Sequence, residues 1–556
     1  MPHDHPVMPT GSAPHESVDV LVVGAGFGGL YAIYRMRALG LRVRCIEAAD
    51  GVGGTWYWNR YPGARCDVES LDYSYSFSDE LQQEWCWSHR YAEQPEILAY
   101  LNHVADRFEL RPHIRFETRV TAMHYDATGG SWTVQTDRGP WVRARYCIMA
   151  SGNLSAPRIP DIKGVERFKG EWHHSARWPK AGVDFAGKRV ALIGTGATGV
   201  QMLPKIAPHA SMVTVFQRTA NFSVPARNYP MPPEEERQQK ANYPALRKAA
   251  RLQNSGMSRV PIPVMSALDL SEQERLRVYE QLWQKGGSAR MMGAFTDLMR
   301  NEAANETLAS FVRAKIHAIV KDPLKREILT PRDHPIGSRR LCVDTDYYET
   351  FNRANVALVD ARRTPITEIT ERGVRTTDAE YVVDIIAFAT GFDAMTGALS
   401  EILITGRDGV RLRDKWASGP ANYLGLMVHG FPNLFVLTGP GSPSVKANMV
   451  TAIEQHIEWI AGCLVYLDQH DIATIEPTAQ AEDDWVQHVN DVANGTLFPR
   501  ATNSWYVGAN IPGKPRVFMP YVGGMPAYIK VCEDVAAHGY RGFHLQKATC
   551  LAAQLS

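Results

Sequence analysis

Three features are scarce in this sequence of 556 residues: an excess of charge, paired cysteines and long apolar runs. Because 60 lysines and arginines balance 59 aspartates and glutamates, the net charge of +1 gives no reason to expect nucleic acid or a membrane surface as a partner. The eight cysteines include no CxxC pair and no metal-ligand spacing. This argues against a disulfide framework, and we expect reduced thiols and no bound metal.

The ends of the chain also lack structural patterns. Residues 1–17 have no charged-then-apolar secretion signal, so we predict a disordered N-terminal tail there and a C-terminal tail over 546–556. No apolar run approaches the roughly 20 residues that a membrane helix needs. We therefore expect a cytoplasmic protein, and 45% hydrophobic with 21% charged residues indicates a globular chain with a sizeable core.

What is present is a complete βαβ unit near the start. An apolar run over 18–23 predicts a strand, Gly24, Gly26 and Gly29 form GxGxxG, and a second strand ends in Glu47. The glycines allow a tight turn, close approach to a pyrophosphate and close helix packing, and the acid accepts a hydrogen bond from a ribose hydroxyl. This unit predicts a site for FAD or NAD.

The same pattern returns with Gly194, Gly196 and Gly199. Aligned on the first glycine, the acid of the first unit becomes the amide Gln217, and Arg218 follows it. A carboxylate would repel a 2′-phosphate, whereas a guanidinium can bind one with two hydrogen bonds. The second unit therefore favours NADP.

Three more apolar runs end in a small residue and a glycine, at Ser151-Gly152, Thr390-Gly391 and Thr438-Gly439. Continuous apolar runs are typical of parallel strands that are buried on both faces. We therefore predict an α/β fold with two dinucleotide-binding, Rossmann-like domains that contain parallel sheets.

We expect the chain to cross between these domains more than once. The predicted FAD domain comprises residues 18–150 and 385–545, and the NADP domain comprises 151–224 and 331–384. The charged segment 225–330 has apolar residues at helical spacing, which predicts a helical insertion in the NADP domain. The sequence leaves open whether this insertion covers the active site or only the surface.

Two further motifs separate this chain from other flavoproteins. A disulfide reductase needs two close cysteines after the first unit, but only Cys45 and Cys66 lie in that region. Residues 54–67 instead read GxWxxxxYPGxxxD. Before the second glycine motif, residues 168–179 read FKGEWHHSARWP, with Phe168, Gly170, His174 and Trp178 as the spaced positions.

With both glycine motifs, these patterns resemble the Baeyer–Villiger monooxygenase family, whose fingerprint is FxGxxxHxxxW(P/D). The resemblance spans about residues 17–545 and is nearest to the phenylacetone and steroid monooxygenase branch. It implies FAD and NADPH as cofactors and the conversion of a ketone (cyclic, aryl or steroid-like) and O2 into an ester or lactone through a flavin C4a-peroxide. We expect a monomer, with a homodimer as the alternative.

The resemblance also implies roles for single residues. Arg340 is the expected catalytic cation, because a fixed positive charge stabilises the peroxide anion and the oxyanion that follows it, and Asp67 is its expected orienting partner. His174 is expected to position the domains rather than to transfer protons. The expected cofactor-binding residues outside the glycine motifs are Glu47, Thr55, Trp56, Asp67, Tyr73, Arg218, Thr219, Arg339 and Trp505.

The segment GPGSPSVKANM is expected to line the substrate pocket with Val445, Lys446 and Met449. Lys446 stands where the phenylacetone-type enzymes have an apolar residue, and the sequence leaves open whether its amine faces the pocket or solvent.

Two alternatives remain. A flavin monooxygenase that oxygenates amines or sulfides has a fingerprint without a tryptophan at the position of Trp178. An FAD/NADP redox protein that inserts no oxygen would leave Arg340, Asp67 and the fingerprint without a role.

Overall fold

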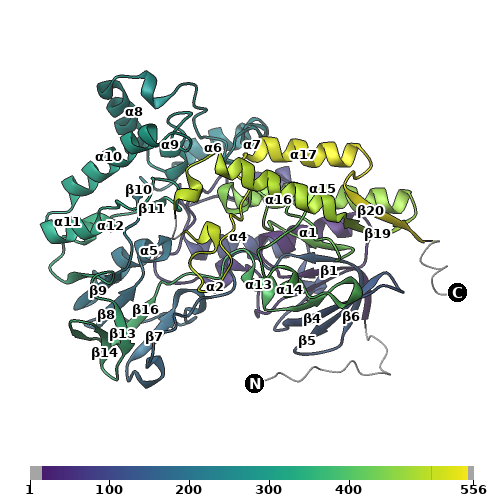
Figure 1. The fold of residues 1–556 in the computed structure, drawn as a ribbon, viewed down its shortest axis with the longest axis horizontal. Coiled ribbons are helices and arrows are strands. Elements are labelled where there is room, and N and C mark those ends of the chain that lie inside the picture. The colour runs from purple at the N-terminus through teal and green to yellow at the C-terminus, as the bar shows by residue number, and fades with distance from the viewer. Residues whose placement is uncertain (1–15, 502–503, 549–556) are drawn as a thin grey trace.

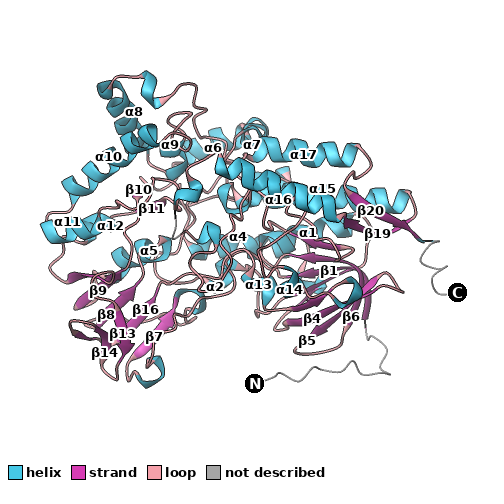
Figure 2. Ribbon diagram, in the orientation of Figure 1, coloured by secondary structure: helices cyan, strands magenta, loops and turns pink. Residues whose placement is uncertain are grey.

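The computed structural model describes residues 16–501 and 504–548 and is an α/β fold with two main β-sheets. The two sheets occupy the lower right and lower left of Figure 1, and most of the long helices lie above them. Figure 2 shows the same separation of strands from helices. Among the described residues, no helix combines the length and apolarity required to cross a bilayer.

The first sheet has eight strands and a parallel centre. β1 (Glu16–Val23) lies between β6 (Val142–Met149) and β2 (Val43–Ile46), and β18 (Leu434–Val436) also runs parallel to β6. The outer strands are β3 (Ile114–Arg115), β4 (Val120–Asp126), β5 (Ser131–Thr136) and β17 (Leu403–Thr405). β5 is antiparallel to both of its neighbours, so this sheet is mixed rather than purely parallel.

Burial on both faces explains the continuous apolar run of β1. Val20 and Val22 contribute to a core that includes α1 (Phe27–Ala38) and α15 (Met449–Gln469). Leu21 and Val23 face a second core on the opposite side. A strand with two buried faces needs an apolar side chain at every position rather than at alternate ones.

The second sheet has five strands, all parallel, in the order β12-β9-β8-β16-β7. Their bounds are β7 (Glu171–His174), β8 (Arg189–Ile193), β9 (Met212–Gln217), β12 (Val356–Asp360) and β16 (Ile385–Phe388). The helix α5 (Ala197–Ile206) follows β8 as α1 follows β1.

Three of the predicted boundaries are wrong. β16 pairs with β8, so the second sheet continues to Phe388 and the chain does not leave it at residue 385.

The predicted N-terminal tail over 1–17 is too long because Glu16 and Ser17 pair with β6; residues 1–15 lie outside the described part. The predicted C-terminal tail over 546–556 begins too early, since β20 (Phe543–Lys547) pairs with β19 (Ile472–Pro477). Residues 549–556 lie outside the described part.

The predicted insertion is helical. It contains α6 (Pro233–Ala241), α7 (Tyr243–Leu252), α8 (Glu272–Lys285), α9 (Ser288–Met292), α10 (Glu302–Ile319) and α11 (Pro323–Leu329). Two of its arginines, Arg259 and Arg290, form ion pairs with buried Glu69, which also binds Arg90 at 2.8 Å. This charge cluster holds the insertion against the segment that follows Asp67.

The smaller elements complete the frame. β10 (Ser223–Pro225) and β11 (Cys342–Asp344) form a parallel pair, and β13 (Ile366–Ile369), β14 (Gly373–Thr376) and β15 (Glu380–Val382) form an antiparallel sheet. The other helices are α2 (Thr55–Trp58), α3 (Asp79–Glu84), α4 (Gln94–Arg107), α12 (Tyr347–Thr350), α13 (Gly397–Ser400), α14 (Leu412–Lys415), α16 (Ala479–Asn494) and α17 (Met525–Ala537).

Candidate active site

A cavity of about 1440 Å³ lies where the carboxyl ends of strands from both sheets meet. Gly24 follows β1 and Gly194 follows β8, and both line the cavity together with the residues after β6 and β16. Ligands of open α/β sheets bind at this edge of the strands. The two glycine motifs therefore face one shared space.

The first glycine of each motif needs its backbone conformation. Gly24 has φ +102° and Gly194 has φ +111°, a region that other residues rarely adopt. A Cβ on Gly24 would lie 2.6 Å from the Ala150 carbonyl oxygen, and one on Gly194 would lie 2.4 Å from that of Ala389. Each glycine thus lets two adjacent strand ends approach closely.

The other glycines differ in what they face. Gly29 and Gly199 do not line the cavity; a Cβ there would strike the carbonyl oxygen of the first glycine at 1.8 and 2.1 Å, respectively, so they serve helix packing. A Cβ on Gly196 would meet nothing within 4 Å, and one on Gly26 would lie 3.3 Å from the Gly54 Cα. Gly26 and Gly196 both line the cavity, so the wall there is bare backbone.

Glu47 closes the first nucleotide site. Its carboxylate accepts hydrogen bonds from the backbone N–H of Ala25 at 2.6 Å and of Ala49 at 2.8 Å. Burial raises its pKa above the ordinary value, and the two N–H donors oppose that shift. The acid lines the cavity and ties the glycine turn to the end of β2.

The predicted second nucleotide site carries positive charge. Arg218, Thr219 and Arg339 line the cavity together. Burial lowers the pKa of Arg339, Asp333 opposes that shift and Arg218 adds to it, and within residues 16–501 and 504–548 the buried Nη1 of Arg339 has no hydrogen-bond partner. Gln217, by contrast, donates to the Ile328 carbonyl at 2.5 Å and does not line the cavity.

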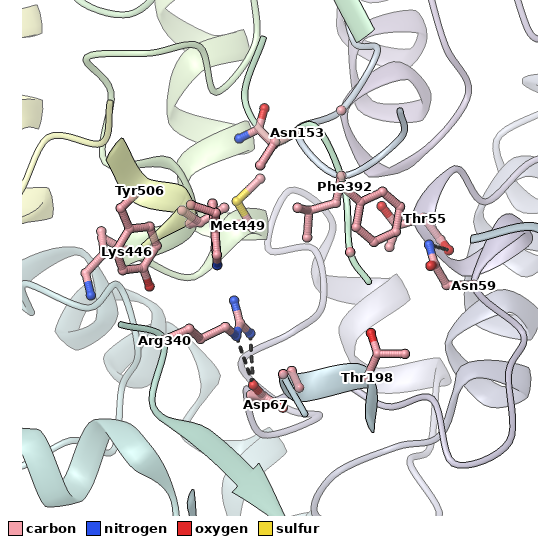
Figure 3. A pocket seen from close by; sticks show the side chains of 18 of the residues that line it. Thr55, Asn59, Asp67, Asn153, Thr198, Arg340, Phe392, Lys446, Met449 and Tyr506 are labelled. Carbon is pink, nitrogen blue, oxygen red and sulfur yellow. Dashed lines mark hydrogen bonds and ion pairs between the residues drawn. The ribbon is translucent and has the colours of Figure 1, made fainter. Parts of the chain in front are cut away.

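Arg340 and Asp67, separated by 273 residues in the sequence, meet between the two nucleotide sites. The Arg340 Nη2 and Nε lie 2.9 and 3.2 Å from Oδ2 of Asp67, as the dashed lines in Figure 3 mark. Although burial opposes the charge, Asp67 raises the pKa of Arg340 above its ordinary value. Arg340 is thus a permanent cation that faces the cavity.

The YPG part of the motif joins the two halves of the site. Tyr61 donates to Oε1 of Gln201 on α5 at 2.9 Å, and Gln201 donates to Asp67 at 3.4 Å. A Cβ on Gly63 would lie 2.4 Å from the Gln201 backbone oxygen. The helix after the second glycine motif therefore contacts the loop that carries Asp67.

Aromatic side chains line the same cavity. Trp56 donates from Nε1 to the Tyr73 hydroxyl at 3.2 Å, next to Thr55, and Trp505 also lines the cavity. Val445, Lys446 and Met449 line it as predicted, and Figure 3 shows Lys446 beside Tyr506.

The fingerprint residues lie outside the cavity. His174 is buried; its Nδ1 accepts from the Ala176 N–H at 3.1 Å, and its Nε2 lies 3.2 Å from both the Arg158 carbonyl oxygen and Oγ1 of Thr390. Burial lowers its pKa to about 4, so the ring is neutral at neutral pH. His174 joins the two linkers through which the chain passes between the sheets.

The other fingerprint residues support this junction. Trp178 is buried with its ring 6.3 Å from that of Phe185, and partly buried Phe168 packs against the core on one face of the second sheet. A Cβ on Gly170 would lie 2.3 Å from the Asp384 carbonyl oxygen.

Several lining residues were missed by the sequence analysis. They are Asn59, Asn153, Arg158, Thr198, Phe392 and Tyr506, with Met292, Phe295 and Met299 from the insertion. Thr198 lies inside the second glycine motif and Phe392 directly follows Gly391, so these predicted turns were a signal that could have found both residues. The insertion residues belong to no motif, so the sequence did not indicate them. Their position shows that the helical insertion lines the cavity and does not only cover the surface.

The residues present fit both predicted dinucleotides. Each glycine motif offers a helix N-terminus and a close backbone approach, and the partnerless guanidinium nitrogen of Arg339 beside Arg218 suits a phosphate. The cavity volume also exceeds that of a usual single-ligand pocket, roughly 300–1,000 Å³.

Comparison with known proteins agrees with this geometry. Residues 17–230 match the family described as flavin-binding monooxygenase-like. The chain is 44% identical over 529 residues to a Baeyer–Villiger monooxygenase of Pseudooceanicola batsensis. The aligned region covers 94% of this chain and 95% of that protein. A solved structure of oxidized steroid monooxygenase bound to NADP matches with a TM-score of 0.91 at 53% identity, and one of OTEMO in complex with FAD and NADP matches with 0.92 at 43%. Each match covers 96% of this chain and 100% of the other.

Proposed function

Since the chain belongs to the Baeyer–Villiger monooxygenase family, we propose that it uses Arg340, held by Asp67, to oxygenate ketones in the cavity between its two nucleotide sites. It is an FAD- and NADPH-dependent monooxygenase that converts ketones into esters or lactones. In the balanced reaction, a ketone, O2, NADPH and a proton give an ester, NADP+ and water.

We assign FAD to the first glycine motif and NADPH to the second. Gly26 and Glu47 would hold FAD, while Arg218 and Arg339 would hold the NADP 2′-phosphate. The chemistry supplied by bound FAD is two-electron reduction by NADPH followed by reaction with O2. In this proposal the first sheet belongs to an FAD domain and the second to an NADP domain, with the crossover after Phe388.

The protein's own contribution to the reaction is electrostatic. Attack on a ketone carbonyl places negative charge on its oxygen, and a fixed cation in a site that excludes water stabilises that charge. Arg340 is suited to this role because it faces the cavity and stays charged. Asp67 fixes the guanidinium and is itself tied to Gln201, so the cation is positioned before the ketone binds.

The observation that carries the proposal is the ion pair between Arg340 and Asp67 inside a cavity shared by two glycine turns. The test is a panel of cyclic, aryl and steroid-like ketones with NADPH, in which ester, hydrogen peroxide and NADPH consumption are all quantified. We expect ester from at least one class, in proportion to NADPH consumed. NADPH oxidation that never yields an ester or lactone would contradict the proposal.

A further inference from the structure

Lys446 places an amine in the wall of the cavity, and among the described residues this amine has no counter-charge. It ends a short turn over Ser444–Lys446 before α15, and its Nζ lies 4.3 Å from the ring centre of Phe498 and 4.9 Å from that of Tyr506. Across residues 16–501 and 504–548, its amine makes no hydrogen bond and no ion pair. Arg340, the other cation of this wall, has Asp67.

An unpaired amine in such a place needs an explanation. Burying a charge without a partner is costly, and the two ring faces offset only part of that cost, about 0.5–2 kcal/mol for each cation–π contact. If the position served packing alone, an apolar side chain would fill it at lower cost. The NADP site proposed above already has two cations of its own, Arg218 and Arg339.

We propose that Lys446 binds a carboxylate on the substrate and so selects ketones that carry an anionic group away from the carbonyl. This inference rests on the proposed function, since it assigns Arg340 to the carbonyl end of the ketone and Lys446 to the anionic end. In Figure 3 the guanidinium of Arg340 lies beside Asp67, and the amine of Lys446 lies to its left, beside Tyr506.

The charge state of Lys446 gives this proposal a distinct signature. Burial, together with Arg340, lowers the pKa of Lys446 to about 7. The titratable groups that face it are Arg340, which stays charged beside Asp67, and Tyr506, whose pKa burial raises to about 12. Lys446 is therefore the group of this set that loses its proton near neutral pH, and a bound carboxylate favours the protonated form.

The experiment compares matched substrates that differ in one negative charge and one methyl group. A homologous series of methyl ketones ending in a carboxylate is assayed beside the corresponding methyl esters, and the ratio of kcat/KM for acid and ester is measured against pH. In the parent enzyme we expect the ratio to favour one acid chain length and to fall as the pH rises through about 7, because kcat/KM follows ionisation of the free enzyme.

Three variants separate charge from packing. Lys446→Met should lower the acid-to-ester ratio about tenfold to a hundredfold, the usual effect of losing a charged hydrogen bond. Lys446→Arg should keep the preference and remove its dependence on pH near 7. Lys188→Met removes the same charge from an exposed site outside the cavity and should leave the ratio unchanged.

Two results would overturn the inference. One is a ratio that is the same in the parent and in Lys446→Met at every pH and chain length. The other is a Lys446→Met variant whose KM for NADPH rises while its acid-to-ester ratio stays fixed, because Lys446 would then serve the coenzyme. Failure of every ketone to give ester would instead contradict the proposed function, so the two failures are distinguishable.

Discussion

At the scale of single residues, the position of Arg340 makes it the most informative side chain to change. Arg340→Ala removes the fixed cation but leaves both glycine turns intact, so we expect ester formation to fall by roughly a hundred- to a thousandfold. NADPH oxidation should continue at a reduced rate and yield hydrogen peroxide. The measurement is the yield of ester and of peroxide per NADPH.

The partner of Arg340 provides the graded comparison. Asp67→Asn keeps the shape of the side chain and weakens its hold on the guanidinium, so its loss of ester should be smaller than that of Arg340→Ala. Ester at the parent rate from Arg340→Ala would remove Arg340 from the proposed mechanism.

Arg218 tests the coenzyme assignment. A charged hydrogen bond to a 2′-phosphate contributes roughly 1.5–3 kcal/mol, so Arg218→Ala should raise the KM for NADPH about tenfold to a hundredfold. NADH has no such phosphate, and its KM should change little. Arg138→Ala, which removes an exposed arginine outside the cavity, is the matched control. Equal effects on the two coenzymes would mean that Arg218 does not contact the 2′-phosphate.

The sequence could indicate the positions of single residues only where a motif fixes local geometry. The glycine turns, Glu47 and Arg218 follow strand ends, and strand ends are readable from apolar runs. Spacing could not pair Arg340 with Asp67 across 273 residues, and only the family resemblance suggested it. Gln201 was missed because nothing local in α5 indicates that it contacts Asp67.

At the scale of elements, His174 connects two linkers, and its ionisation gives a test. Because burial lowers its pKa to about 4, below the roughly 6.5 of an unfolded chain, the stability it contributes is present above about pH 6.5 and is lost as the pH falls towards 4. His174→Phe removes its hydrogen bonds to both linkers and should reduce the free energy of unfolding by about 1–3 kcal/mol at neutral pH.

The pH dependence separates this role from simple packing. The difference in unfolding free energy between the parent and His174→Phe, measured by urea denaturation, should shrink between about pH 6.5 and pH 4. His173→Phe is the neighbouring control. The His173 ring lies 5.5 Å from that of Trp178, a contact that phenylalanine can keep, and its ion pair is with exposed Glu171, a kind of pair that contributes little. If the difference in unfolding free energy stays constant with pH, the His174 ring stabilises the protein by its shape alone.

Elements were predictable in proportion to their burial. The strands before Glu47 and before Gly194 were predicted because an apolar run ends there at an acid or a glycine, and the structure has them as Val43–Ile46 and Arg189–Ile193. The strand Ile385–Phe388 was also predicted, but it was assigned to the wrong sheet. Its pairing with β8 joins residues that lie far apart in the sequence, so no local pattern indicates it. The antiparallel strands β13–β15 carry no strong apolar run and were not predicted.

At the scale of the whole molecule, the reaction depends on how the two sheets are placed across one cavity. The direct contact between the YPG loop and α5 is one place where that placement is set. Arg340 comes from the second half of the chain and Asp67 from the first, so a small shift between the halves would move the cation relative to both nucleotide sites. Misplacing reacting groups by about 1 Å can cost a hundredfold in rate.

Gly63 provides the means to change this placement by one methyl group. Its φ is +82°, and a Cβ there would lie 2.4 Å from the Gln201 backbone oxygen of α5, so Gly63→Ala must push the loop and the helix apart. Gly182 has φ +77° with nothing within 4 Å of a Cβ, so Gly182→Ala introduces the same backbone strain, about 1–2 kcal/mol, without the clash. Both variants should lose similar stability from strain, but only Gly63→Ala should slow flavin reduction by NADPH, measured by stopped flow, and lower the ester yield per NADPH. If the two variants lose activity equally, the contact between the YPG loop and α5 does not control how the two halves of the site are aligned.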